Sequence, residues 1–97
     1  MAATKPKYLT VDQNFHARLS AAEDAPEIVV PLKFKAGLYR RVVSAGDGVM
    51  QFATVLEGLD LHKELAAYDD LELVDASEVS AEYFAALTAA LGAQPGK

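Results

Sequence analysis

The chain of 97 residues contains no cysteine and no tryptophan, and it contains a single isoleucine, Ile28. Without thiols it has no disulfide framework, no cysteine-ligated zinc, no iron–sulfur cluster and no thiol nucleophile. No run approaches the roughly 18 apolar residues of a membrane-spanning helix. No apolar signal segment follows the positively charged start of the chain. We therefore expect a soluble, cytoplasmic protein that makes no contact with a membrane.

Alanine and leucine make up much of what is present, with 18 and 12 residues, and 52% of the chain is apolar. Both residue types lose little free energy on entering a helix, so the composition favours helices. The length allows one domain, because each half of a divided chain would approach the roughly 40 residues below which folding usually needs extra support. Alanine buries little area, so we expect a light core and a homo-oligomer or an obligate partner.

The net charge of −5 is unevenly distributed along the chain. Residues 1–41 hold seven Lys/Arg and four Asp/Glu, whereas residues 42–97 hold two and ten. Nucleic acid is not the expected partner, because phosphate contacts need a basic face. Two interpretations remain: an acidic surface that keeps the protein soluble, or head-to-tail association of the unlike-charged halves.

The chain divides into a flexible N-terminal arm at residues 1–13, one globular domain at residues 14–92 and a flexible tail at residues 93–97. Tyr8–Val11 is a possible short extended piece within the arm. Residues 14–35 are predicted to be an extended segment or a β-hairpin, and residues 36–92 to be helical. The pattern at residues 14–24 fits a strand or a helix, and we favour a strand because the next segment needs a partner.

That next segment, residues 27–35, is the clearest strand. Its alternation places four apolar side chains on one face: Ile28, Val30, Leu32 and Phe34. Pro31 has no backbone N–H to donate, which predicts an edge strand or a bulge. The residues at 23–26 favour a turn between the two strands.

From residue 36 onwards the pattern predicts a compact bundle of about four short helices, so the fold class is mainly α. Asp47 and Asp60 are candidate N-caps, and Asp75 with Glu78 resembles a capping box for the last helix. Gly58 is the expected C′ residue of the second helix. Two further glycines are predicted to end the first and last helices, Gly46 and Gly92. The predicted helical core consists of Leu38, Val42, Phe52, Leu56, Leu65, Leu87 and Leu91.

Few side chains are arranged for catalysis or ligand binding. His16 and His62 lie in separate segments, and Glu64 does not share a helix face with His62. The serines at 20, 44, 77 and 80 lie in no nucleophile motif, and Ser77 and Ser80 fit the first turn of the last helix. The loop at residues 46–48 lacks a phosphate-binding lysine, and the acidic run at residues 69–78 lacks the calcium-loop pattern. We expect no enzyme activity, no cofactor and no metal.

The remaining candidate is a surface for another protein. Tyr39 and Val43 flank the main apolar stripe of the first helix, and Phe84 lies beside the stripe of the last. The candidate partner-binding surface is therefore Tyr39, Val43, Tyr83, Phe84 and Leu87. The alternative is that these residues form the other edge of a broad buried stripe.

The order of these segments resembles a known family. An extended segment is followed by Leu-Tyr-Arg-Arg-Val-Val, then by Gly-Asp-Gly-Val-Met-Gln-Phe-Ala-Thr-Val-Leu-Glu-Gly-Leu, a short acidic helix and loop, and Ala-Glu-Tyr-Phe-Ala-Ala-Leu-Thr-Ala-Ala-Leu-Gly. Over residues 26–92 the chain is similar to the small tail assembly chaperones of long-tailed bacteriophages, particularly those that infect actinobacteria.

The resemblance implies a helical, non-enzymatic protein that acts in the host cytoplasm while the tail is built. Its implied partners are the tape measure protein, which it would coat, and tail tube subunits, which it would recruit. It would be absent from the mature virion. The family also makes a longer product by a frameshift, often at Gly-Lys codons, and this chain ends Pro95-Gly96-Lys97. The alternatives are a structural virion component, such as a head–tail connector or decoration protein, and a small acidic adaptor or inhibitor.

Overall fold

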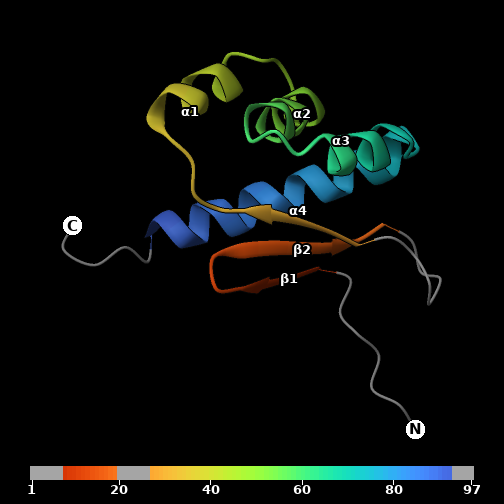
Figure 1. Ribbon diagram of the computed structural model, residues 1–97, viewed down its shortest axis with the longest axis horizontal. Helices are drawn as coiled ribbons and strands as arrows, with labels where there is room; N and C mark the ends of the chain where they lie inside the picture. The colour runs from red at the N-terminus through yellow and green to blue at the C-terminus, as the bar shows by residue number, and fades with distance from the viewer. Residues whose placement is uncertain (1–7, 20–26, 93–97) are drawn as a thin grey trace, which may run out of the picture.

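The computed structural model describes residues 8–19 and 27–92, which form a three-stranded antiparallel sheet followed by four helices (Figure 1). The elements in chain order are β1 (Tyr8–Val11), β2 (Asn14–Arg18), β3 (Glu27–Pro31), α1 (Ala36–Val43), α2 (Gly48–Gly58), α3 (His62–Asp69) and α4 (Leu73–Gly92). The prediction of a mainly α fold after an N-terminal extended region is confirmed. The expected turn at residues 23–26 and tail at residues 93–97 lie outside the described residues. Among the described helices none is long and apolar enough to cross a membrane.

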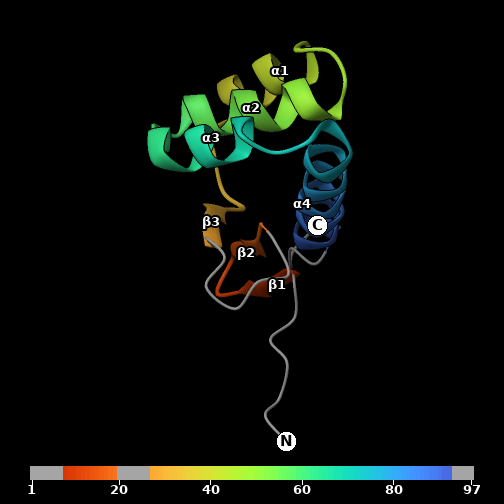
Figure 2. The same ribbon diagram turned by 90° about the vertical axis from the view of Figure 1, so that its right-hand side faces the viewer.

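The helices form two groups around the sheet. α1, α2 and α3 make a layer at one end of the molecule, and α4 runs beneath this layer beside the sheet (Figure 2). α2 lies at the centre, because α1, α3 and α4 all pack on it. The last helix spans 20 residues, so the expected bundle of short helices is in fact three short helices and one long one.

Apolar side chains at alternate positions of the strands explain which face of the sheet packs on the core. Phe15 and Ala17 of β2 and Ile28 and Val30 of β3 are buried on the face toward the core, and the register pairs Phe15 with Val30. The strand interpretation is therefore confirmed at residues 14–18. The sheet order is β1-β2-β3, which makes β3 an edge strand as Pro31 predicted.

The first strand corrects the prediction of a flexible arm for residues 8–13, and the rest of that predicted arm lies outside the described residues. Tyr8–Val11 pairs with β2, and the hydroxyl of Tyr8 donates to a carboxylate oxygen of Glu78 on α4 at 2.8 Å. Asp12 and Gln13 make the two-residue turn to β2, both with positive φ (53° and 66°). This backbone is typical of hairpin turns that normally contain glycine, and the absence of glycine is why the hairpin was missed.

The predicted helix boundaries are partly right. The side chain of Asp47 accepts a hydrogen bond from the backbone N–H of Met50, so it is the N-cap of α2 as predicted. Asp60 is not an N-cap: its φ is 60°, and Leu61 precedes α3 instead. The capping-box prediction is also wrong, since α4 begins at Leu73 and Asp75 lies inside its first turn.

Gly58 is the last residue of α2 rather than its C′ residue. A methyl group at Gly58 would overlap the side chain of Leu38 on α1, so glycine is needed there for close packing of the two helices. Gly46 has a φ of +123° and lies in the turn that joins α1 to α2, two residues beyond the C-cap Ser44. The two glycines therefore set how α1 lies on α2.

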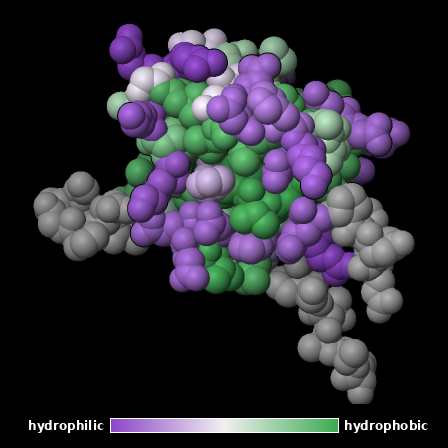
Figure 3. Space-filling view, viewed as in Figure 1, coloured by the Kyte–Doolittle hydropathy of each residue, from purple (hydrophilic) through white to green (hydrophobic). Residues whose placement is uncertain are grey.

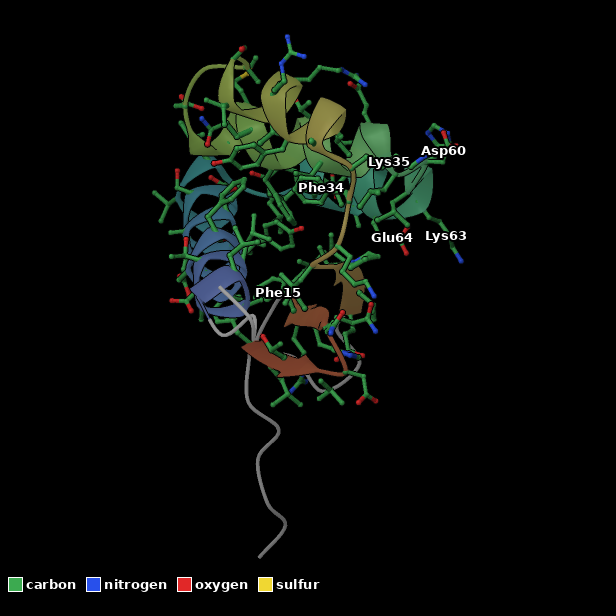
Figure 4. The ribbon with its side chains drawn as sticks, turned by 90° about the vertical axis from the view of Figure 1, so that its left-hand side faces the viewer. Phe15, Phe34, Lys35, Asp60, Lys63 and Glu64 are labelled. Atoms are coloured by element: carbon green, nitrogen blue, oxygen red, sulfur yellow. The ribbon has the colours of Figure 1, made fainter. Side chains whose placement is uncertain are left out.

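Tyr83 joins the sheet to the helical layer at the centre of the core. Its ring contacts those of Phe15 on β2 and Phe52 on α2, with centroids 5.4 and 4.9 Å away. Its hydroxyl donates to the backbone oxygen of Pro31 on β3 at 2.8 Å. Figure 4 shows Phe15 reaching from the sheet into this interior and Phe34 lying on the linker below the helical layer. Burial raises the pKa of Tyr83.

The predicted helical core is confirmed for Val42, Phe52, Leu56 and Leu87, which are buried. Leu38 and Leu65 are partly buried against it. Leu91 is exposed, so its assignment to the core was wrong.

Candidate partner-binding surface

The two histidines lie far from one another in the fold. His16 on β2 has Nδ1 3.8 Å from a carboxylate oxygen of Glu27, and His62 has Nε2 3.4 Å from one of Asp60. The second pair is almost fully exposed to solvent. Within residues 8–19 and 27–92 there is no group of three or more His, Cys, Asp or Glu side chains that would hold a metal ion.

Ser80 is buried in α4, which differs from the expected first-turn position. Its hydroxyl donates to the backbone oxygen of Ala76 at 2.8 Å and shares a short hydrogen bond with the hydroxyl of Tyr68. Burial raises the pKa of Tyr68, and the hydrogen bond with Ser80 lowers it in part. The hydroxyl pair therefore has its hydrogen bonds satisfied inside the core and serves to fix α3 against α4.

The candidate surface divides into two parts. Tyr83 and Leu87 are buried, so their inclusion in a partner-binding surface was wrong. For these two residues the alternative holds, since they belong to a broad buried stripe of α4. Phe84 is half-buried and packs edge-on against Tyr83, with ring centroids 5.2 Å apart.

Tyr39 and Val43 remain as exposed apolar residues. They are 48% and 54% exposed and lie one turn apart on α1, so they occupy the same side of the helix. The neighbouring side packs on α2 through the buried Val42 and the partly buried Leu38. Arg40 and Arg41 are exposed in the last turn, where a rotation of about 100° per residue puts Arg40 beside the apolar pair and Arg41 on the far side of the helix. α1 therefore presents an apolar pair bordered by positive charge.

Sequence reasoning missed a second exposed apolar pair. Leu73 and Val74, at the start of α4, are 71% and 77% exposed, more than any other large apolar side chain described. They were missed because the last helix was expected to start at Asp75, the predicted N-cap, and it starts at Leu73. The spacing of Leu73 from Ala76, Ser80 and Tyr83 was the available signal, because it continues the same helical stripe.

Smaller apolar areas lie elsewhere on the surface. Met50 is exposed beside Gly46 in the α1–α2 turn, and Leu9 and Val11 are exposed on β1. Figure 3 shows hydrophobic side chains between hydrophilic ones across one face of the helices, with another hydrophobic area at the sheet edge. The exposed apolar surface is thus divided into several small patches.

Comparison with protein-family models, with curated proteins and with solved structures finds no match.

Proposed function

We propose that this chain is a non-enzymatic tail assembly chaperone of a long-tailed bacteriophage, which binds tape measure and tail tube proteins transiently in the host cytoplasm. The family comes from the resemblance over residues 26–92. The observation that carries the binding role is the exposed pair Tyr39 and Val43 on α1, next to Arg40. Tyrosine and arginine are the residue types that most often supply binding energy at protein interfaces.

The surfaces of the tape measure and tail tube proteins, the clients of the proposed chaperone, give the physical reason for such a role. Subunits that later polymerise expose apolar surface and unpaired strand edges, and these aggregate unless another protein covers them. A small acidic chain with an exposed apolar pair covers such surface while its own charge keeps the complex soluble. The small size of the pair favours a weak, reversible contact, which suits a chaperone that leaves the finished tail.

Co-expression with the neighbouring tape measure and tail tube proteins tests the proposal. We expect the chain to raise the soluble fraction of at least one client and to co-purify with it. Tyr39→Ala/Val43→Ala should lose both effects without losing fold, because about half of each residue's surface is exposed to solvent and neither belongs to the buried core. No gain in solubility and no co-purification by the native chain would overturn the proposal.

A matched control uses another exposed apolar pair, Leu9 and Val11 on β1, which are 47% and 42% exposed. Leu9→Ala/Val11→Ala removes similar apolar area from a different surface and should leave client binding unchanged. Equal loss in both double variants would show that the α1 pair has no special role.

Composition of purified virions distinguishes the alternative of a permanent structural component. A transient chaperone is present in cells that assemble tails and absent from finished particles. A stoichiometric amount of the chain in purified particles would favour the connector or decoration role instead.

A further inference from the structure

α1 and the linker before it carry positive charge around the exposed apolar pair. We define the basic face as the exposed residues Lys33, Lys35, Tyr39, Arg40 and Val43. No Asp or Glu occurs between residues 28 and 46. None of these three cations forms an ion pair with any other residue that the structure describes. The apolar pair and its charges are therefore available to a partner of opposite charge.

The turn from α3 into α4 has the complementary character. We define the acidic corner as the exposed residues Asp69, Asp70, Glu72, Leu73 and Val74. Residues 64–92 contain seven Asp/Glu and no Lys or Arg. The three carboxylates of the corner have no ion-pair partner within the described ranges. Their charge is favourable at the start of α4, but the helix dipole does not explain the exposed Leu73 and Val74.

The stripe of α4 shows that the corner extends past the core of its own chain. Ala76, Ser80, Tyr83 and Leu87 follow one another at spacings of four, three and four residues, and all are buried. Leu73 precedes Ala76 by three residues and so continues this stripe by one turn, yet it is 71% exposed. The described part of the chain thus leaves the first turn of a buried stripe uncovered.

The two surfaces lie apart in the molecule. α1 is at the upper left in Figure 1, whereas the turn from α3 into α4 is at the right-hand end. In the view of Figure 2 the start of α4 is nearest the viewer and α1 lies behind α2. One surface therefore does not cover the other within a single chain.

We infer that the acidic corner docks on the basic face of a second copy of this chain. Each copy carries both surfaces, and each surface has the charge and the apolar centre that the other needs. Because the two surfaces differ and lie at opposite ends of the helical part of the molecule, one contact leaves a free surface of each kind, so copies join head to tail in rows or larger rings. Leu73 and Val74 cover Tyr39 and Val43, while the carboxylates face Lys33, Lys35 and Arg40.

The two kinds of contact have different effects. Exposed ion pairs add little affinity, but they set orientation and speed the encounter, and salt weakens them. The apolar side chains supply most of the affinity through the area they bury. With two apolar residues on each side the contact is smaller than a standard interface, so association is weak and grows with protein concentration.

Sedimentation velocity over a concentration series tests this inference. The native chain should grow past a dimer at low salt, and high salt should weaken association about tenfold. Tyr39→Ala/Val43→Ala and Leu73→Ala/Val74→Ala should each weaken it about tenfold or more. The matched control Leu9→Ala/Val11→Ala should associate like the native chain. A native chain that is monomeric up to millimolar concentration, or that stops at a dimer, would overturn the inference.

Mixing the two interface variants gives the sharper result. Each variant alone self-associates at least about tenfold more weakly than the native chain, but the intact corner of one fits the intact basic face of the other, so an equimolar mixture should form a heterodimer with the native affinity and stop there. No heterodimer would contradict docking of these two surfaces. Unchanged melting temperatures in all three variants confirm that the exposed substitutions leave the fold intact.

This inference shares the basic face with the proposed function but does not depend on it. Leu73→Ala/Val74→Ala should lose self-association and still bind a client. Suppose that this variant self-associates like the native chain, while Tyr39→Ala/Val43→Ala loses only client binding. The inferred head-to-tail contact is then wrong, and the proposed function stands. If the native chain self-associates as expected but binds no client, the head-to-tail contact stands and the proposed function is wrong.

Discussion

At the scale of single residues, Tyr83 does most to hold the described parts together. It touches an aromatic ring of the sheet and one of α2, and its hydroxyl bonds to the last residue of β3. Tyr83 lies at the centre of the core because α4 packs against both α2 and the sheet. The sequence pattern located Tyr83 on the helix but contained no information on how many elements surround it.

Tyr83→Phe tests this position at neutral pH. It keeps the ring contacts and removes the hydroxyl that donates to the Pro31 oxygen, so stability should fall by about 1 kcal/mol. Chemical denaturation with an unchanged m-value would measure this loss. A variant as stable as the native chain would show that the hydrogen bond makes no net contribution.

High pH should destabilise the folded protein, because Tyr83 is buried. The pKa of buried Tyr83 is raised above the value near 10 of an unfolded tyrosine. The unfolded state therefore loses its proton first, and the stabilisation present below about pH 10 falls by up to about 1.4 kcal/mol per pH unit above it. Denaturant midpoints measured from neutral to alkaline pH should decline less steeply in Tyr83→Phe. Equal slopes would contradict the assignment.

Gln13 is the residue most clearly out of place. It has a φ of 66° in the turn between β1 and β2, where side chains other than glycine are strained. Gln13→Gly should therefore stabilise the protein by about 0.5–1 kcal/mol, because the turn then has its preferred residue. Gln13→Ala retains the strain and is the control. A glycine variant no more stable than the alanine variant would contradict this account of the turn.

At the scale of elements, the position of α1 depends on a close approach. Leu38 packs where Gly58 has no side chain, and α1 rests mainly on α2. This contact holds the basic face outward, because it directs Leu38 and Val42 inward. The packing of α1 on α2 therefore determines which side chains of α1 are exposed.

A double-mutant cycle on Gly58 and Leu38 tests this dependence. Gly58→Ala improves helix propensity but forces Leu38 out of its site, so we expect a net loss of about 1 kcal/mol. In the Leu38→Ala background the same change should be neutral or stabilising, because the overlap is gone. Calorimetric melting of the four proteins measures the coupling. Additive effects would show that the two residues do not meet.

Elements with a clear periodicity of apolar residues or with an N-cap residue were predictable from the sequence. β3 followed from Ile28 and Val30 in alternation, and the start of α2 from Asp47. β1 was less predictable because its turn, Asp12 and Gln13, has no glycine. The starts of α3 and α4 were misplaced because acidic residues near a helix suit its dipole without being the N-cap.

The binding surface was harder to predict than the elements. Periodicity separates a helix into faces, but burial depends on what lies opposite each face. Tyr83 and Tyr39 therefore looked alike in sequence, and the structure places one in the core and the other in solvent. Leu91 shows the reverse error, because it was assigned to the predicted core and is exposed.

At the scale of the whole molecule, the basic and acidic residues of the unevenly charged sequence lie in two different places. The basic residues 33–41 lie on and before α1, and the acidic residues 69–72 lie at the turn into α4. Each area surrounds exposed apolar side chains. The opposed charges and the small exposed apolar patches are the features on which the proposed contacts with other proteins rest.

Photo-cross-linking from position 39 is the most direct measurement of the central claim, that α1 binds a client while the tail is built. A photoreactive phenylalanine analogue replaces Tyr39, and in a control chain it replaces Leu9. Position 39 should cross-link to the tape measure or tail tube protein in cells that are assembling tails, position 9 should not, and purified particles should lack the chain. Cross-links to neither client from position 39, or a chain retained in finished particles, would contradict the account.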